Sequence, residues 1–386
     1  MIPYARQYID KRDINSVNRV LKSKFLTQGP ETIKFEKKLS RFCGSKFAVS
    51  VNSATSALHL SCLALGVKKN DYVWTSPVSF VASANCALLC GAKIDFVDID
   101  LNTVNISTEL LEKKLKTSQA NNKLPKILIV VHFGGTSCDM KKIYQLSKIY
   151  KFKIIEDASH ALGGKYKKKF IGNCEYSDLC VFSFHPVKII TSSEGGAVLT
   201  NNKNIAKKIT ILRSHGIERK TKKINLNKNE IYNYDQKYLG INYRMSDLSA
   251  ALGNSQLDKA IKFVDKRNKI AQYYYKKLSS LPINFQEINK DIKSSYHLFI
   301  IRLDLKKIKL NKNKIYNNLI KNGINVNIHY IPIYKHSFFQ KLGFSKTYCH
   351  NAEIYFKQTI TIPLYFSLTI AQIDKIIKIL KKTINH

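Results

Sequence analysis

The chain has 386 residues, 44% hydrophobic and 11% aromatic, which is enough to bury a large core in two domains. The chain has only 16 glycines and 8 prolines, which argues against a fibrous protein. It shows no apolar run of membrane-spanning length and no apolar signal segment, which argues against a membrane or secreted protein. We therefore expect cytoplasmic localisation and no membrane partner. The formal net charge of +37 comes from lysines spread along the whole chain, which predicts a solvated basic surface rather than a nucleic-acid partner.

Helix-like and strand-like segments alternate through the first half of the sequence. Two helices are expected between about 15 and 40, followed by a strand and helix over 47–65. Further strands are expected at 71–76, 93–100, 126–133, 152–159 and 177–184. Helices are expected between them, at 79–92, 108–117 and 139–151. This alternation predicts an α/β fold with a central, mostly parallel sheet covered by helices on both faces, which binds ligands beyond the carboxyl ends of its strands.

The second half of the sequence predicts a smaller α/β domain. Residues 213–234 are polar and weakly periodic, as in a loop, and 247–281 resemble one long helix with a break near Gly253. A strand at 295–305 and a helix at 311–323 follow. We therefore expect an N-terminal segment and large domain over 1–255 and a small C-terminal domain over 256–386.

Small and hydroxyl residues separate the strand and helix of 47–65. Asn52 to Ser56 (NSATS) would present free backbone N–H groups at the start of a helix, together with side-chain hydroxyls and the helix dipole. That combination accepts a phosphate group. An ordinary serine or threonine cap explains the same residues, so this motif alone leaves both interpretations open.

A pair of carboxylates, Glu156 and Asp157, ends the strand at 152–159. An acid at this position is well placed to pair with a cationic ring nitrogen, although an aspartate here also suits the cap of a following helix. No second ligand cluster accompanies the pair, and the eight scattered cysteines lack zinc spacing. We therefore expect no metal site.

Lys188, in SFHPVKIIT, differs from the other lysines by its position. It follows an apolar strand, it is the one Lys or Arg between Lys169 and Lys203, and the small residues TSSEGG come after it. A lysine attacks aldehydes when its amine is neutral and accessible; otherwise it is an ordinary surface lysine. A phosphate cradle, a strand-end aspartate and such a lysine are together what pyridoxal 5′-phosphate requires.

These residues resemble the DegT/DnrJ/EryC1/StrS family of sugar aminotransferases. The resemblance runs nearly end to end, through LTQGP, NSATSAL, EDASHALG, SFHPVKIITSSEGGA, RSHG, NYRMSDLSAALG and IHYIPIY. It implies the fold-type-I pyridoxal-phosphate fold (aspartate aminotransferase-like). Details of FLTQG, NSATSAL, SFHPVK and HYIPIY are most similar to family members of pseudaminic acid biosynthesis. The implied reaction moves an amino group from glutamate to the C4 ketone of UDP-4-keto-6-deoxy-N-acetyl-β-L-altrosamine.

The resemblance also implies roles for the residues around the cofactor. Lys188 would carry the cofactor as a Schiff base and act as general acid and base, while Asp157 would pair with the pyridine nitrogen. His160 would lie near the ring and Phe80 would stack on it, whereas Trp74 is expected in the core. The implied phosphate ligands are Ala54, Thr55, Ser183 and, from the neighbouring subunit of a homodimer, Asn242.

Substrate contacts are implied in three segments of the chain. They are Tyr4, Lys24, Phe25, Leu26, Thr27, Ile328, His329, Tyr330 and Ile331. Polar roles or structural pairing remain open for Arg213, His215 and Arg244, and His185 has no assigned role.

Several alternative functions stay open at this point. They are an aminotransferase for a dTDP- or GDP-linked 4-keto sugar, a pyridoxal-phosphate sugar dehydratase, and a basic nucleic-acid-binding protein. Dehydratases of this family carry histidine where Lys188 stands, so Lys188 favours transamination.

Overall fold

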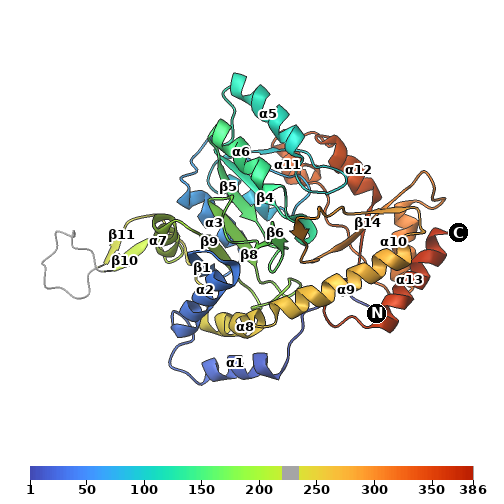
Figure 1. The fold of residues 1–386 in the computed structure, drawn as a ribbon. Coiled ribbons are helices and arrows are strands. Elements are labelled where there is room, and N and C mark those ends of the chain that lie inside the picture. Colours follow the sequence, from blue (N-terminus) through green and yellow to red (C-terminus); the bar gives the residue numbers. More distant parts are fainter. Residues whose placement is uncertain (220–233, 386) are drawn as a thin grey trace, which may run out of the picture.

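The computed structural model describes residues 1–219 and 234–385, which build a large central sheet. Its strands are β1 (Phe47–Val51), β2 (Tyr72–Thr75), β3 (Lys93–Phe96), β4 (Ile127–Val131), β5 (Lys153–Asp157), β8 (Leu179–Ser183) and β9 (Gly196–Thr200). The order is β1-β9-β8-β5-β4-β2-β3 (Figure 1). Strand β9 runs antiparallel to both of its neighbours, and the other paired strands run parallel. The expected mostly parallel sheet is confirmed.

Helices cover both faces of this sheet because alternate side chains of each buried strand point to opposite sides. Within β4, Ile127 and Ile129 pack in the core under α3 (Ala54–Ala64), α4 (Ala82–Leu88) and α7 (Lys203–Leu212). Leu128 and Val130 pack on the other face, under α5 (Thr108–Ala120) and α6 (Met140–Tyr150). Trp74 lies in this second core and is 0% exposed, which confirms its expected packing role.

The helices before and after the sheet lie against its β1 end. They are α1 (Lys11–Leu21), α2 (Pro30–Cys43) and α8 (Asp247–Leu257). Gly29, directly before α2, provides no side-chain cap, and the carboxylate of Asp247 accepts the N–H of Thr32 at 3.3 Å instead. Asp247 lies more than two hundred residues later in the chain and packs directly against Gly29. An added Cβ on Gly29 would lie 2.2 Å from Oδ2 of Asp247, so this close packing requires glycine.

The break expected near Gly253 is wrong in position. Helix α8 continues through Gly253 to Leu257, and the break lies at Asp258 and Lys259, before α9 (Ala260–Leu278). A Cβ on Gly253 would lie 3.0 Å from Cε2 of Phe35. Glycine therefore allows close packing of α8 on α2, and its weak helix propensity is overridden by that tertiary contact.

The polar segment 213–234 lies mostly outside the described residues. Its described ends include β10 (Ile217–Arg219), which pairs antiparallel with β11 (Tyr234–Gln236). The two strands form a ribbon that projects from the body of the protein (Figure 1).

The C-terminal part has its own sheet and apolar core. Strands β12 (Ile283–Phe285), β14 (Phe299–Leu303) and β15 (Thr359–Ile362) pair antiparallel and are covered by α10 (Lys312–Lys321), α13 (Ile370–Ile384) and the long helix α9. The remaining elements are β6 (Lys165–Tyr166), β7 (Lys169–Phe170), β13 (Ile292–Lys293), α11 (Ser337–Lys341) and α12 (His350–Gln358), with short 3₁₀ turns at 133–135 and 333–335.

Two connections tie this part to the rest of the protein. The N–H of Ile2 donates to the carbonyl of Gly323 at 2.7 Å, so the chain start lies on the C-terminal part. Conversely, Tyr334 and Tyr355 of the C-terminal part pack into the core of the large sheet, under α3 and α4. The proposed domain boundary at 255/256 stays a prediction.

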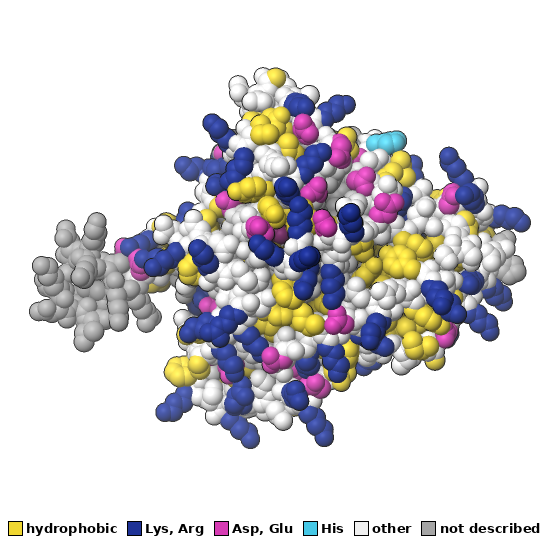
Figure 2. Space-filling view, viewed as in Figure 1, with side chains coloured by type: hydrophobic (Ala, Val, Ile, Leu, Met, Phe, Trp, Pro, Cys, Tyr) yellow, Lys and Arg dark blue, Asp and Glu magenta, His cyan; other side chains and the backbone are white. Residues whose placement is uncertain are grey.

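Charge is dispersed on the face drawn in Figure 2. Lysine and arginine side chains are scattered over it, with acidic and apolar side chains between them. None of the helices in residues 1–219 and 234–385 combines the length and the apolar character needed to cross a membrane.

Candidate active site

A cavity of about 760 Å³ lies at the carboxyl ends of the central strands. Val131, Asp157 and Ser183, the last residues of β4, β5 and β8, all line it. This is the edge at which parallel sheets bind ligands. Of the residues implied by the resemblance, the cavity brings together Tyr4, Ala54, Thr55, Phe80, Asp157, His160, Ser183, Lys188, Ile328, His329, Tyr330 and Ile331.

The other implied residues do not line this cavity. They are Lys24, Phe25, Leu26, Thr27 and Asn242. Thr27 pairs with Ser246 in an isolated β-bridge, and Asn242 pairs with Ser214. The side chain of Phe25 is 53% exposed. These five residues lie outside the cavity lining of this chain, and their roles stay predictions.

Lys188 lies in a turn after β8, where its N–H donates to the carbonyl of His185 at 2.9 Å. Burial lowers the pKa of its amine from 10.5 to about 8, and the carboxylate of Asp157 opposes that shift. The neutral amine is therefore far more populated near neutral pH than in an exposed lysine. A neutral, cavity-facing amine has the chemistry of a nucleophile and a general base.

The carboxylate of Asp157 is held by two serines. Ser83 of α4 donates its hydroxyl to Oδ2 at 2.7 Å, and the Ser159 hydroxyl donates to Oδ1 at 2.6 Å. Ser79 lies 2.7 Å from the Ser83 hydroxyl and extends this chain. A turn, and no helix, follows Asp157, so it has no helix-capping role. Its carboxylate is fixed at the cavity wall.

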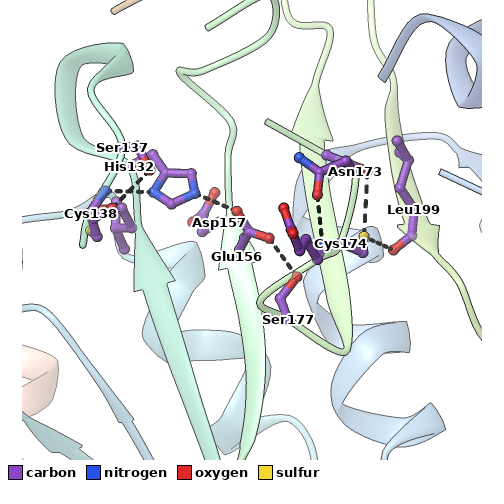
Figure 3. Close-up of polar contacts among 12 residues, drawn as sticks. His132, Ser137, Cys138, Glu156, Asp157, Asn173, Cys174, Ser177 and Leu199 are labelled. Atoms are coloured by element: carbon purple, nitrogen blue, oxygen red, sulfur yellow. Dashed lines mark hydrogen bonds and ion pairs between the residues drawn. The ribbon is translucent and has the colours of Figure 1, made fainter. Parts of the chain in front are cut away.

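The neighbouring acid, Glu156, points to the opposite face of the sheet and has a different environment (Figure 3). Its Oε2 lies 2.7 Å from Nε2 of His132, and its Oε1 accepts the Ser177 hydroxyl. The N–H of Cys138 donates to Nδ1 of His132 at 3.2 Å, which places the ring proton on Nε2, toward Glu156. These contacts hold three segments of the core together, so the role of Glu156 is structural.

The start of α3 forms the wall expected to hold phosphate. The hydroxyl of Ser53 caps the helix by accepting the N–H of Ser56 at 3.1 Å, and Ser53, Ala54 and Thr55 all line the cavity. The first N–H groups of a helix have no partner within it. A Cβ on Gly196 would lie 2.6 Å from the backbone nitrogen of Ala54, so glycine is needed for β9 to pass this close. The capping and ligand-binding interpretations are therefore compatible.

Neutral histidines form part of the facing wall. The hydroxyl of Tyr330 lies 3.2 Å from Nε2 of His160, and the ring of His297 lies 4.3 Å from the His160 ring. Burial, with the charge of Lys188, holds the pKa of His160 well below its usual value and lowers that of His329 to about 3. These rings therefore stay uncharged beside Lys188.

The cavity also contains residues that sequence reasoning missed. They are Leu58, Ser79, Val81, Ala82, Val131, Ser159, His185, Val187, Glu194, Asn327 and His336, whereas Ser53 belongs to the expected phosphate-binding segment. Glu194 lies beside the glycine pair after Lys188, and that position was the available signal. Nε2 of His185 lies 4.0 Å from Oε1 of Glu194. Asp157 and Glu194 are the two carboxylates among the described residues that line the cavity.

The residues with open roles lie mostly in structural contacts. Arg213 pairs with Glu36 and donates to the carbonyl of Ser50 at 2.6 Å. Arg244 donates to the Ser214 hydroxyl at 2.9 Å. Among the described residues, no group of three or more His, Cys, Asp or Glu side chains has a metal-binding arrangement.

Comparison with known proteins identifies the family. The model of the DegT/DnrJ/EryC1/StrS aminotransferase family matches residues 7–381. The chain belongs to this family. It is 41% identical over 367 residues (95% of this chain, 93% of the relative) to UDP-4-amino-4,6-dideoxy-N-acetyl-β-L-altrosamine transaminase of Campylobacter jejuni serotype O:23/36.

Solved structures of the DegT/DnrJ/EryC1/StrS aminotransferases confirm the expected fold. Helicobacter pylori PseC, an aminotransferase involved in the biosynthesis of pseudoaminic acid, matches with a TM-score of 0.90 and 33% identity over 100% of this chain and 99% of that chain. Streptococcus pneumoniae Spr1654, described as a sugar aminotransferase, matches in its PLP form with a TM-score of 0.88 and 28% identity over 100% and 98%. The same protein also matches in its PMP form. These structures indicate pyridoxal phosphate as the family's cofactor.

Proposed function

We propose that this chain is a pyridoxal-phosphate-dependent aminotransferase that moves an amino group from glutamate to the C4 ketone of UDP-4-keto-6-deoxy-N-acetyl-β-L-altrosamine, in pseudaminic acid biosynthesis. The observation that supports it most is the position of Lys188, whose amine has a lowered pKa and faces the same cavity as Asp157 and the start of α3. The choice of sugar rests on the Campylobacter and Helicobacter relatives.

The residues of the cavity fit the cofactor. Ala54, Thr55 and Ser183 offer N–H and hydroxyl donors for its phosphate, and Gly196 leaves room beside them. Asp157, fixed by two serines, offers a carboxylate for a protonated ring nitrogen. When bound, pyridoxal phosphate supplies an aldehyde carbon and a ring that stabilises negative charge on the neighbouring carbon.

The chain's own side chains would carry the proton transfers and the positioning. The neutral amine of Lys188 would remove the proton from Cα of glutamate and later deliver a proton to C4 of the sugar. Neutral His160, held by Tyr330, would pack beside the ring without adding positive charge near Lys188. Phe80, 59% exposed at the cavity, would cover the bound group against water.

We also propose a homodimer in which the neighbouring subunit completes the site. Large apolar side chains at 25–33 and 238–241 are exposed, and Leu239 is 88% exposed. Burial of such a surface favours association. The same region carries Asn242 and Lys24 to Thr27, which the resemblance places near cofactor and sugar.

All eight cysteines are free, as expected in a reducing cytoplasm.

One experiment tests activity and substrate together. The purified protein is incubated with pyridoxal phosphate, reduced with borohydride and digested, and the modified peptide is identified by mass spectrometry. UDP-, dTDP- and GDP-linked 4-keto-6-deoxy sugars are then supplied with glutamate, and product masses are measured. The proposal expects modification at Lys188 and an amino sugar with the UDP substrate.

The same measurement separates the alternatives. Amination of a dTDP- or GDP-linked sugar alone would contradict the proposed substrate. A product that has lost water instead of gaining an amine would indicate a dehydratase. Protein without any cofactor adduct would contradict the proposed chemistry altogether.

A further inference from the structure

A second, much smaller cavity lies beside the turn that carries Lys188. Its volume is about 10 Å³, compared with about 760 Å³ for the active-site cavity. Lys188 is the one described residue that lines both cavities. Three parts of the chain enclose the small cavity: Arg6 and Tyr8 from the chain start, Lys188 and Thr191 from the segment between β8 and β9, and Phe263 and Arg267 from α9.

Arg267 brings a buried positive charge to this small cavity. Its side chain is 2% exposed, and the arginines that form an ion pair with a carboxylate in residues 1–219 and 234–385 are Arg19 and Arg213 instead. Nη1 of Arg267 donates to three backbone carbonyls at 2.8, 3.2 and 3.3 Å, but its Nε has no hydrogen-bond partner among the described residues. A buried charge and a buried donor are both costly without partners, so this group requires a bound water or ion.

The surroundings of the small cavity are electropositive. The charged residue types in its described lining are Arg6, Lys188 and Arg267, and all three are basic. A further cation lies close by, because Nζ of Lys262 is 5.8 Å from the centroid of the Phe366 ring, which also lines the cavity. This environment favours a negatively charged occupant.

A nearby carboxylate is already engaged elsewhere. Gln256, which lines the small cavity, donates to Oδ2 of Asp13 at 2.7 Å, and the same oxygen lies 2.6 Å from Nζ of Lys259. The charge of Asp13 is thus compensated by Lys259. A water molecule in the cavity would satisfy the Nε donor of Arg267 but leave its charge unbalanced, whereas an anion would do both.

The size and the walls of the small cavity restrict the anion to a single atom. A volume of about 10 Å³ holds one group of about the size of a water molecule, so phosphate, sulfate and carboxylates are too large. The rings of Tyr8 and Phe263 pack on Phe366, with centroids 4.9 and 4.6 Å from that of Phe366, and form one wall. Ring edges carry partial positive charge and are compatible with an anion. A halide ion meets these limits.

We propose that this small cavity is a binding site for one halide ion, with chloride as its natural occupant, held by the guanidinium group of Arg267. The ion balances the buried charge and accepts the hydrogen of Nε. It also joins the chain start, the segment between β8 and β9, and α9. Because Lys188 lies in that segment, the bound ion supports the turn that carries Lys188. The site depends on the fold alone and is independent of the proposed reaction.

Crystals of the full-length protein, grown with pyridoxal phosphate and sodium bromide, test the site directly. Bromide scatters X-rays anomalously and water does not, so an anomalous difference map distinguishes the two occupants. We expect a peak in the small cavity, in contact with the guanidinium group of Arg267. A water molecule without anomalous signal at this position, or no density at all, would overturn the proposal.

A solution measurement with two variants tests whether the ion binds outside a crystal. Thermal denaturation is followed in sodium chloride and in sodium gluconate at equal ionic strength, because an ion that binds the folded state raises the melting temperature as its concentration increases. We expect a saturating rise in chloride that Arg267→Met loses and that Arg41→Met, at an exposed arginine near the end of α2, keeps. An equal chloride response in the two variants would contradict the assigned site. If Arg267→Met does not fold, as circular dichroism would show, the bromide map of the unmodified chain decides alone.

Discussion

The hydroxyl of Ser83 donates a 2.7 Å hydrogen bond to Oδ2 of Asp157, which ties helix α4 to the end of strand β5. Ser159 holds the other carboxylate oxygen, so both oxygens have a fixed donor. A carboxylate restrained in this way keeps its orientation toward the cavity, and a binding group held by its neighbours loses less entropy when a ligand arrives.

Replacement of Ser83 tests this relationship. Ser83→Ala removes one donor to a charged acceptor and should weaken binding of pyridoxal phosphate about tenfold, through loss of the restraint on Asp157. Absorbance titration with the cofactor measures the dissociation constant. Ser279→Ala, at an exposed serine after α9, is the control and should bind as the unmodified chain does. Equal affinity in the two variants would show that Ser159 alone orients Asp157.

Removal of the Lys188 amine should abolish two properties at once. Lys188→Ala should lose the borohydride-trapped adduct and lower the rate of amino transfer by about 1,000-fold or more, since one group serves as attachment point and as general base. Peptide mass spectrometry and a steady-state assay measure them. Lys203→Ala, at an exposed lysine at the start of α7, should keep both. An active Lys188→Ala protein would contradict the assigned role.

The lowered pKa of Lys188 predicts how its reactivity depends on pH. In cofactor-free protein, acylation of Lys188 should rise with an apparent pKa of about 8, well below the 10.5 from which burial lowers it. Peptide mass spectrometry across pH 6 to 11 measures the acylated fraction. The Asp157 carboxylate raises the Lys188 pKa, so Asp157→Asn should shift the Lys188 curve to still lower pH. A shift to higher pH would contradict this electrostatic assignment.

The close approach of β9 to α3 predicts a cost for any side chain at position 196. Gly196→Ala puts a Cβ 2.6 Å from the backbone nitrogen of Ala54, so the start of α3 must move. We expect a loss of about 1–3 kcal/mol in the free energy of unfolding, together with weaker cofactor binding. Denaturant unfolding and absorbance titration measure the two. Unaltered values would show that the start of α3 adjusts freely.

A shared site predicts complementation between two inactive variants. Lys188→Ala and Asn242→Ala should each be inactive alone, but a mixed dimer has one site with an intact lysine and the other subunit's intact asparagine. After dissociation and reassociation of equal amounts, about a quarter of the unmodified activity should return, since half of the dimers are mixed and carry one working site. No recovery, with mixed dimers confirmed by mass spectrometry, would place Asn242 in its own subunit's site.

Much of the fold was accessible from sequence because its signals are local. Short apolar strands such as 126–133 and amphipathic helices such as 139–151 fix element type by periodicity, and their alternation implies the parallel sheet. The predicted helix break near Gly253 was wrong because its signal is not local. Whether a glycine ends a helix or accommodates a neighbour depends on Phe35, more than two hundred residues earlier in the chain.

The sequence by itself determined the order of the chemical groups: hydroxyl residues at a helix start, Asp157 at a strand end and Lys188 after the next buried strand. Only the tertiary structure decided how these groups behave. It lowers the pKa of Lys188 by burial, fixes Asp157 through Ser83, and closes the cavity with His329 and Tyr330 from the far end of the chain. Desolvation and hydrogen bonding depend on atoms brought together by packing, and a linear pattern of residues does not specify which atoms those are.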